Sequence, residues 1–285
     1  MGNKYEKLPP LRQIVEDSGL LSRYGFSKKL GQNFLFDLDI TRRIAKTAAP
    51  LNGYNVIEVG PGPGGLTRAI LELEPNKVFA IEKDPQCISA LTELTVLSEG
   101  TLSIIEGDAQ KIKPQELING PLKIIANLPY NVGTKLLIGW LHDLTNISSL
   151  TLMFQKEVAL RITASPGTKD YGRLSVLSQY LCNVSRVFDL PPHVFKPAPK
   201  VFSSVVHFVP KTRGKHDLDL VPFIEKITGA AFSQRRKMLR TSLKSVFSEI
   251  NLDKVFKIFN ISPTERAENL SIEQFINLAQ FMSSI

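Results

Sequence analysis

The stretch "YNVIEVGPGPGG", residues 54–65, decides the fold class of this chain. Its first half is short and mostly apolar, as in a buried strand, and its second half is a glycine-rich turn that opens a helix. Glycines in such a turn let the backbone bend sharply and approach a ligand, and the helix N-terminus behind them favours polar or anionic groups. The stretch therefore predicts the first strand and the ligand-binding loop of an α/β domain.

Glycine spacing alone does not choose the ligand of this loop. Gly60, Gly62 and Gly65 satisfy the G-x-G-x-x-G pattern of dinucleotide sites. Gly60, Gly62 and Gly64 satisfy a G-x-G-x-G pattern, which suggests S-adenosylmethionine (SAM). A plain strand-to-helix turn that binds nothing is the third interpretation, and the glycines leave all three open.

Two acidic residues at the ends of later strands narrow the choice of ligand for the glycine loop. Glu82 ends the strand-like run at 77–84, where an acid can accept hydrogen bonds from ribose hydroxyls. The alternative for Glu82 is a surface carboxylate paired with Lys83. Asp108 ends the run at 102–109, where it could accept a hydrogen bond from an adenine amine while the Ala109 N–H binds a ring nitrogen. Beside a glycine loop, the two acids together predict an adenosine-containing cofactor.

Strand-like and helical runs alternate outward from this loop, from residue 54 to residue 209. Such alternation predicts right-handed βαβ crossovers and a mostly parallel sheet. The last two strand-like runs, 185–191 and 201–209, are joined by a short Pro-rich segment without room for a crossover helix, so they should pair antiparallel. After a polar linker at 210–220, residues 217–285 show only helical periodicity, which predicts a small all-α domain.

Composition limits the classes of function. Of 285 residues, 43% are hydrophobic and 22% are charged, and no apolar run approaches the ~18 residues of a membrane span. Two cysteines cannot form a disulfide framework, four scattered histidines suggest no metal site, and the N-terminus lacks an apolar secretory segment. We therefore expect a cytoplasmic protein with no membrane contact and no metal. The net charge of +8 leaves open either a solvated basic surface or a polyanionic partner.

The residues Asn127-Leu128-Pro129-Tyr130 end a strand that should adjoin the first one at the topological switch point. An adenine N6 amine is a poor nucleophile because its lone pair is delocalised into the ring. The Asn127 side-chain oxygen and the Leu128 carbonyl, aimed by the proline turn, could hold both N–H groups and direct that lone pair. Tyr130 could stack on the base. The alternative is a turn that carries a tyrosine by chance.

Seven segments together resemble the KsgA-type rRNA adenine N6,N6-dimethyltransferases. They are "KKLGQNFL" (28–35), "EVGPGPGGLT" (58–67), "NLPYNV" (127–132), "FQKEVALRI" (154–162), "YGRLSV" (171–176), "VFKPAPKVFSSVV" (194–206) and "AFSQRRKMLRTSL" (231–243). The resemblance implies a Rossmann-like class I SAM methyltransferase domain, mostly parallel with an antiparallel last strand, and a small all-α C-terminal domain. The expected limits are an N-terminal extension (1–25), a catalytic domain (26–212) and a helical RNA-binding domain (213–285).

The resemblance also implies roles for individual residues. SAM is the expected cofactor, S-adenosylhomocysteine is its product, and no metal takes part. The positions that match the family's SAM contacts are Asn33, Leu35, Gly60, Glu82, Asp108 and Asn127, and Gly62 and Ala109 complete the expected cofactor site. The catalytic motif comprises Asn127, Leu128, Pro129 and Tyr130, and Phe195 matches the aromatic that sandwiches the flipped base against the tyrosine.

The substrate that the resemblance implies is small-subunit (16S) rRNA. Family members dimethylate two adjacent adenosines in a hairpin loop near its 3′ end, whereas related resistance enzymes methylate large-subunit rRNA. "LGQNFL" and "QRRKMLRTSL" resemble the small-subunit group more closely, and "LPPLRQIVEDSGL" (8–20) resembles the extension of mitochondrial and α-proteobacterial members. The expected partner is the small ribosomal subunit, during its biogenesis, and we expect the chain to act as a monomer. The rivals are a DNA adenine methyltransferase and a non-catalytic ribosome-assembly factor or transcription cofactor.

A basic segment follows in the predicted helical domain, since there is no acid from Lys226 to Ser248. Its periodicity predicts a helix with Phe232, Leu239, Leu243 and Val246 on one side and basic residues on another. The candidates for RNA binding are Arg235, Arg236, Lys237, Arg240 and Lys244, with Lys28 and Lys29 extending the basic surface near the pocket mouth. The helix either tracks phosphates or is a surface helix with spare charge.

Overall fold

The computed structural model describes residues 4–20, 32–211, 218–247 and 250–285. They divide into two compact units, which we describe separately. The first unit contains the chain up to Lys156 together with Ser185–Val209, and the second contains Glu157–Val184 and Pro210–Ile285. The second unit therefore combines a mid-chain segment with the C-terminal segment, whereas the sequence places residues 26–212 in one functional domain. Those functional limits stay a prediction.

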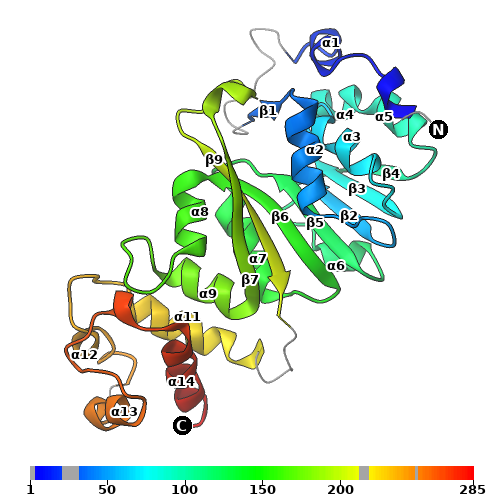
Figure 1. The fold of residues 1–285 in the computed structure, drawn as a ribbon. Coiled ribbons are helices and arrows are strands. Elements are labelled where there is room, and N and C mark those ends of the chain that lie inside the picture. The colour runs from blue at the N-terminus through cyan, green and yellow to red at the C-terminus, as the bar shows by residue number, and fades with distance from the viewer. Residues whose placement is uncertain (1–3, 21–31, 212–217, 248–249) are drawn as a thin grey trace. The chain divides into compact units, whose positions relative to one another are not determined.

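A seven-stranded sheet forms the centre of the first unit (Figure 1). Its strands are β2 (Asn55–Val59), β3 (Lys77–Glu82), β4 (Leu102–Glu106), β5 (Leu122–Asn127), β6 (Ile147–Gln155), β7 (Cys182–Leu190) and β9 (Ser203–Pro210). Their order is β4-β3-β2-β5-β6-β9-β7. The pairs β2–β3, β2–β5, β3–β4 and β5–β6 are parallel, and β9 runs antiparallel to β6. The Rossmann-like, mostly parallel sheet with an antiparallel last strand along the chain, β9, is thus confirmed; in the sheet β9 lies between β6 and β7.

The register of the central strands positions the functional motifs. Val59 of β2 lies opposite Ile81 of β3 and opposite Ala126 of β5. The residues that follow, Gly60, Glu82 and Asn127, therefore emerge at one edge of the sheet. The predicted neighbourhood of the first strand and the Asn127 strand is confirmed, and it places the switch point of the sheet beside the glycine loop.

Short helices flank the sheet of the first unit. They are η1 (Lys4–Lys7), α1 (Leu11–Asp17), α2 (Leu38–Thr47), α3 (Gly65–Leu71), α4 (Pro85–Ala90), α5 (Thr92–Leu97), α6 (Pro114–Leu117), α7 (Gly133–His142) and η3 (Pro192–Val194). The Asp37 side chain caps α2 and the Asp84 side chain caps α4 by accepting backbone N–H groups of the first turn. The helical run predicted at 85–97 is divided into α4 and α5 at Leu91.

A second, two-stranded sheet lies outside the main one. In it β1 (Phe34–Leu35) pairs antiparallel with β8 (Phe195–Lys196), and Leu35 lies opposite Phe195. The N-terminal residues pack against this region, because Val15 and Leu20 are fully buried in one cluster with Phe34. Residues 4–20 of the predicted extension therefore contribute to the apolar core of the first unit.

The second unit is helical over its described residues after 217, namely 218–247 and 250–285. Its helices are α8 (Lys156–Thr163), which begins at the unit boundary, α9 (Arg173–Leu181), α11 (Val221–Ala231), α12 (Leu239–Ser242), α13 (Leu252–Ile258), η4 (Ala267–Asn269) and α14 (Ile272–Ser283). α11 packs on both α9 and α14. Within the described parts of both units, no helix is long and apolar enough to cross a bilayer.

The helix predicted through the basic segment is wrong for most of its length. α11 ends at Ala231, turns follow, and a regular helix resumes only in α12. The reason lies in tertiary partners, because the Leu239 N–H donates to the Glu265 carbonyl at 2.7 Å and takes no bond within a helix. The predicted apolar side is partly retained, since Leu239 and Leu243 are both fully buried.

Candidate active site

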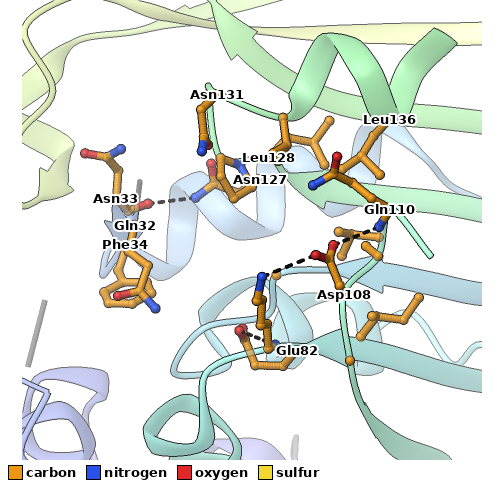
Figure 2. Close-up of a pocket in the computed structure, with 18 residues that line it drawn as sticks. Gln32, Asn33, Phe34, Glu82, Asp108, Gln110, Asn127, Leu128, Asn131 and Leu136 are labelled. Atoms are coloured by element: carbon orange, nitrogen blue, oxygen red, sulfur yellow. Dashed lines mark hydrogen bonds and ion pairs between the residues drawn. The ribbon is translucent and has the colours of Figure 1, made fainter. Parts of the chain in front are cut away.

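A pocket opens in the first unit where β2, β3 and β5 end. It is lined by six of the residues predicted to bind a cofactor, namely Asn33, Gly60, Glu82, Asp108, Ala109 and Asn127. Asn127, Leu128 and Pro129 of the predicted catalytic motif line the same pocket. Figure 2 shows the acids on one side of the space and Asn127 with Leu128 on another. The structure therefore brings the two predicted motifs together in one cavity.

Glu82 is held by the backbone. Its Oε1 accepts the N–H groups of Lys83 at 2.7 Å and Asp84 at 2.9 Å, and its Oε2 accepts the Gly62 N–H at 3.2 Å. The residue is only 7% exposed, and burial raises the pKa of its carboxyl group even though these donors favour the charged form. The alternative of a surface carboxylate paired with the Lys83 ammonium is therefore wrong.

The Lys83 ammonium pairs with Asp108 instead, at 3.2 Å from Oδ2 (Figure 2). The Gln110 backbone N–H donates to Asp108 Oδ1 at 3.0 Å, and this bond together with Lys83 lowers the pKa of Asp108. Asp108 is thus an ionised acceptor at neutral pH, at the wall that also carries Ala109.

The glycine loop is closed to side chains either by its backbone conformation or by close neighbours. Gly60 and Gly62 have φ values of +70° and +56°, which L side chains rarely adopt. A Cβ atom at Gly62 would also lie 2.7 Å from the Phe34 ring, and one at Gly65 would lie 2.8 Å from the Leu35 carbonyl oxygen. β1 therefore lies tightly against the loop. Gly62 acts on the pocket indirectly, through its N–H bond to Glu82.

Asn127 presents one particular atom to the pocket. Its Nδ2 donates to the Asn33 carbonyl at 2.9 Å, a bond drawn in Figure 2. With Nδ2 engaged in this way, Oδ1 is the atom of the amide that can accept a hydrogen bond from a ligand. The Pro129 carbonyl accepts the Gly133 N–H at 3.0 Å, so the turn after Asn127 leads directly into α7. Such a turn fixes the direction of the Leu128 carbonyl.

Tyr130 is half-buried and has a defined partner. Its hydroxyl lies 2.6 Å from the Ser203 hydroxyl at the start of β9. Burial raises the pKa of Tyr130, so the phenol stays neutral in the physiological range. The hydrogen bond ties the predicted catalytic motif to β9, two strands away from β5 in the sheet.

Two predicted site residues lie in the core. Phe195 is 0% exposed and belongs to the main hydrophobic cluster of the first unit, as does Leu35 opposite it. Stacking on a base would require the Phe195 ring to become uncovered, so that role stays a prediction. Leu35 supports the glycine loop through its carbonyl position near Gly65.

Other pocket residues escaped prediction from the sequence. Gln32 and Phe34 flank the predicted Asn33, and Gln110 and Asn131 flank predicted residues on the opposite walls. Gln32 is positioned by its Nε2, which donates to Asp84 Oδ2 at 2.6 Å. Their closeness in sequence could have identified them, because each lies within two residues of a predicted site residue.

Glu58 of the glycine-loop stretch is a buried acid with an unusual environment. It is 1% exposed, and neither carboxylate oxygen has a hydrogen-bond partner among the described residues. Burial raises the pKa of Glu58 to about 8, a shift that Thr67 only partly offsets. The group is thus a neutral carboxylic acid at pH 7.

The basic residues predicted to bind RNA occupy different settings in the second unit. Arg235 is tied down, because its Nη2 donates to the Lys169 and Tyr171 carbonyls at 2.7 and 3.0 Å. Arg240 lies 3.8 Å from Asp253. The others, Arg236, Lys237 and Lys244, are exposed. Lys28 and Lys29 lie outside the described residues. Within the described ranges no group of His, Cys, Asp or Glu is arranged to hold a metal ion.

Comparisons with known proteins agree over nearly the whole chain. The family model described as "Ribosomal RNA adenine dimethylase" matches residues 24–284. The chain is 50% identical over 277 residues to the "Ribosomal RNA small subunit methyltransferase A" of Agrobacterium fabrum, covering 95% of this chain and 97% of that protein. It is similar to the crystal structure of a dimethyladenosine transferase from Plasmodium falciparum, with a TM-score of 0.76, 25% identity and coverage of 88% and 98%. The 23S rRNA methyltransferase ErmE shares the fold, with a TM-score of 0.68, 23% identity and coverage of 88% and 100%.

Proposed function

This chain belongs to the ribosomal RNA adenine dimethylase family, and on that premise we propose that it dimethylates the N6 amines of two adjacent adenosines in small-subunit rRNA. The proposed adenosines lie in a hairpin loop near the 3′ end, where unstacking a base costs least. One observation carries the proposal, namely that the strand-end acids and residues Asn127, Leu128 and Pro129 line a single pocket. One side of that pocket suits a nucleoside cofactor, and the other suits a planar amine.

The acidic side of the pocket fits SAM, which when bound supplies an electrophilic methyl group. A carboxylate has about four acceptor positions, and three backbone N–H groups orient Glu82 without filling them all, so a ribose hydroxyl can still be accepted. Asp108 and the Ala109 N–H offer the acceptor and donor that an adenine edge requires. Gly60, with its positive φ, lets the backbone pass close to the ligand.

The other side of the pocket prepares the amine. Asn127 Oδ1 and the Leu128 carbonyl accept hydrogen bonds from the two N–H groups, which pulls the nitrogen toward tetrahedral geometry and directs its lone pair. Because the nitrogen forms its bond to carbon before it loses a proton, the site needs no strong base and the proton can leave to water. These fixed dipoles also stabilise the positive charge that develops on the nitrogen.

Tyr130 is the residue we propose to stack on the target base. Its hydrogen bond to Ser203 fixes the ring edge without using the ring face. Phe195 is the proposed second ring of the sandwich, and it would have to leave its buried position to take that role. In a second methylation the monomethyl amine has one N–H left, so one of the two acceptors can still hold it, provided that the pocket has room for the first methyl group once the amine has rotated.

The remaining proposals concern the RNA-contacting residues, the oligomeric state and the cellular location. We propose that Arg236, Lys237, Arg240 and Lys244 contact rRNA phosphates and that Arg235 mainly supports this segment. We propose that the chain acts as a monomer on the small ribosomal subunit in the cytoplasm, where that particle matures.

The test is a comparison of substrates. Purified protein and labelled SAM are incubated separately with unmethylated small subunits, large-subunit rRNA and duplex DNA, and each product is digested for nucleoside mass spectrometry. We expect N6,N6-dimethyladenosine at two neighbouring positions in the small-subunit RNA alone. Label in large-subunit rRNA or in DNA would replace this substrate with that of a rival, and SAM binding without label anywhere would favour a non-catalytic role.

A further inference from the structure

An exposed aromatic ring stands next to the catalytic motif without any role in the pocket. Phe202 is 47% exposed and directly precedes Ser203, the residue whose hydroxyl bonds to Tyr130 at 2.6 Å. Its backbone carbonyl accepts the Lys156 N–H at 2.8 Å, so the segment is fixed to the end of β6. Single exposed apolar side chains are common on protein surfaces, so the exposure of Phe202 gains its meaning from the groups around the ring.

One cation lies over this ring and belongs to a charged network. The Lys156 ammonium lies 5.7 Å from the centre of the Phe202 ring. Asp189 holds that ammonium at 2.8 Å and the Arg186 guanidinium at 2.6 Å, and it also accepts the Ser204 hydroxyl at 2.7 Å. Burial raises the pKa of Asp189, but these donors outweigh burial and hold it at about 2, so the network stays ionised at neutral pH.

The charge of the surroundings is positive. Asp189 carries one negative charge against the two positive charges of Lys156 and Arg186, and Lys196 and Lys200 of the same segment are exposed. Lys156 and Arg186 keep 44% and 36% of their side-chain surface exposed, so both can still reach a ligand. An exposed ring flanked by partly neutralised cations fits one nucleotide, with the base on the ring and the phosphate on the cations.

We propose that Phe202, Lys156 and Arg186 form a subsite for a nucleotide that flanks the target adenosine in single-stranded RNA. This inference rests on the proposed function, because it assumes that the target base enters the pocket beside Tyr130. The Tyr130–Ser203 bond then has a second consequence. It links Tyr130, which stacks on the target base, to Phe202, which stacks on the neighbouring base, because Ser203 directly follows Phe202. Every base offers a ring face, so the subsite reads the presence of an unpaired neighbour and not its identity.

The experiment uses the full chain and a stem-loop RNA with two adjacent loop adenosines. The base analogue 2-aminopurine replaces each flanking loop nucleotide in turn, because its fluorescence is quenched when it stacks. We expect quenching at one flanking position with the wild-type chain. Phe202→Ala should abolish it and weaken RNA binding about 5- to 100-fold, the range expected for loss of one base stack. Phe202→Trp should retain both, and SAM binding should be unchanged in each variant.

Two controls separate this inference from the proposed function. Val209→Ala removes an exposed apolar side chain at the opposite end of β9 and should leave quenching and affinity at wild-type values. Lys156→Gln should lower the slope of log affinity against log salt by about one. Wild-type affinity and quenching in Phe202→Ala would overturn the subsite even if the wild-type chain methylates RNA normally. If Phe202→Ala binds the bare stem-loop normally but binds small subunits weakly, the ring faces a ribosomal protein and the RNA assignment is wrong.

Because the readouts are binding and fluorescence, they report on the subsite even if no methyl group is transferred. A wild-type chain that binds the stem-loop with quenching but methylates neither the stem-loop nor unmethylated small subunits would overturn the proposed function and keep the subsite. A wild-type chain that binds no RNA would overturn both.

Discussion

The pocket of the first unit and the basic segment of the second unit, residues 232–244, hold their polar and charged side chains in opposite ways. In the pocket, the Glu82 carboxylate is met by three backbone N–H groups and the Asn127 amide by a backbone carbonyl. In the basic segment, Arg236 and Lys237 stand exposed on turns. Substitution of a side chain that the backbone holds in place should cause a large loss of ligand affinity or activity. Substitution of one exposed charge should cause only a small loss of RNA affinity, independent of the other charges.

The largest effect is expected where the pocket region meets the core. Phe195→Ala should lower the free energy of unfolding by about 3–5 kcal/mol, because a fully buried ring leaves a cavity. Tyr130→Ala, at a half-buried position, should cost much less stability yet lose most methyl transfer. Urea denaturation of both variants, with single-turnover assays beside it, measures the difference. Normal stability of Phe195→Ala combined with lost transfer would show that the ring leaves the core to stack on the base.

The next effect tests whether backbone-held acids carry cofactor affinity. Glu82→Ala should weaken SAM binding about 10- to 100-fold, as expected for hydrogen bonds to a charged group worth ~1.5–3 kcal/mol. Asp108→Ala should weaken SAM binding less, because one Asp108 oxygen already pairs with the Lys83 ammonium. Isothermal titration with SAM measures both, and NADH serves as the control ligand. Tight binding of NADH without a response to SAM would overturn the cofactor assignment.

A third effect, spread over several pH units, concerns the pH dependence of stability in the pocket region. The pKa of Glu58 is raised from 4.5 to about 8 in the folded state, so the folded chain keeps a proton that the unfolded chain releases. The contribution of Glu58 is therefore present below pH 4.5 and is lost as pH rises toward 8, by at most ~1.4 kcal/mol per pH unit.

Glu58→Gln should flatten that decline, which denaturation at pH 5, 6.5 and 8 would reveal. Glu93→Gln, at an exposed position of α5, is the matched control and should leave the pH profile unchanged. A decline of equal slope in wild type and Glu58→Gln would show that Glu58 is ionised in the folded chain.

The smallest effects are expected in the basic segment. Arg236→Gln, Lys237→Gln and Lys244→Gln should each lower the slope of log affinity against log salt by about 0.9, with SAM binding untouched. Arg235→Gln should behave differently, since loss of its bonds to the Lys169 and Tyr171 carbonyls should also reduce stability. Titration of RNA binding between 50 and 200 mM salt measures the slopes. Unchanged slopes in all three exposed variants would make this segment a bystander.

The same contrast explains what the sequence could predict. The glycine loop, Glu82, Asp108 and Asn127 follow strands whose parallel register alone brings their ends to one edge, so their meeting was foreseeable. The burial of Phe195 depends on its pairing with Leu35, a contact far apart in the chain that no local pattern announces. The turns before α12 likewise depend on a distant carbonyl, that of Glu265, which outweighs local helical periodicity. The Lys83–Asp108 pair was missed because Lys83 follows Glu82 in the sequence, which suggested Glu82 as its partner.

The division of the second unit along the chain has a consequence for biosynthesis. α9 leaves the ribosome before α11 and α14, the helices on which it packs. At synthesis rates of about 5–20 residues per second, the mid-chain helices must therefore wait for the last part of the polypeptide before they can bury their apolar faces. A nascent chain that stops short of α14 lacks one of the two helices that pack on α9, and it leaves that face of α9 open to chaperones and proteases. An enzyme of the ribosomal RNA adenine dimethylase family thus completes its second unit only after α14 has been synthesised.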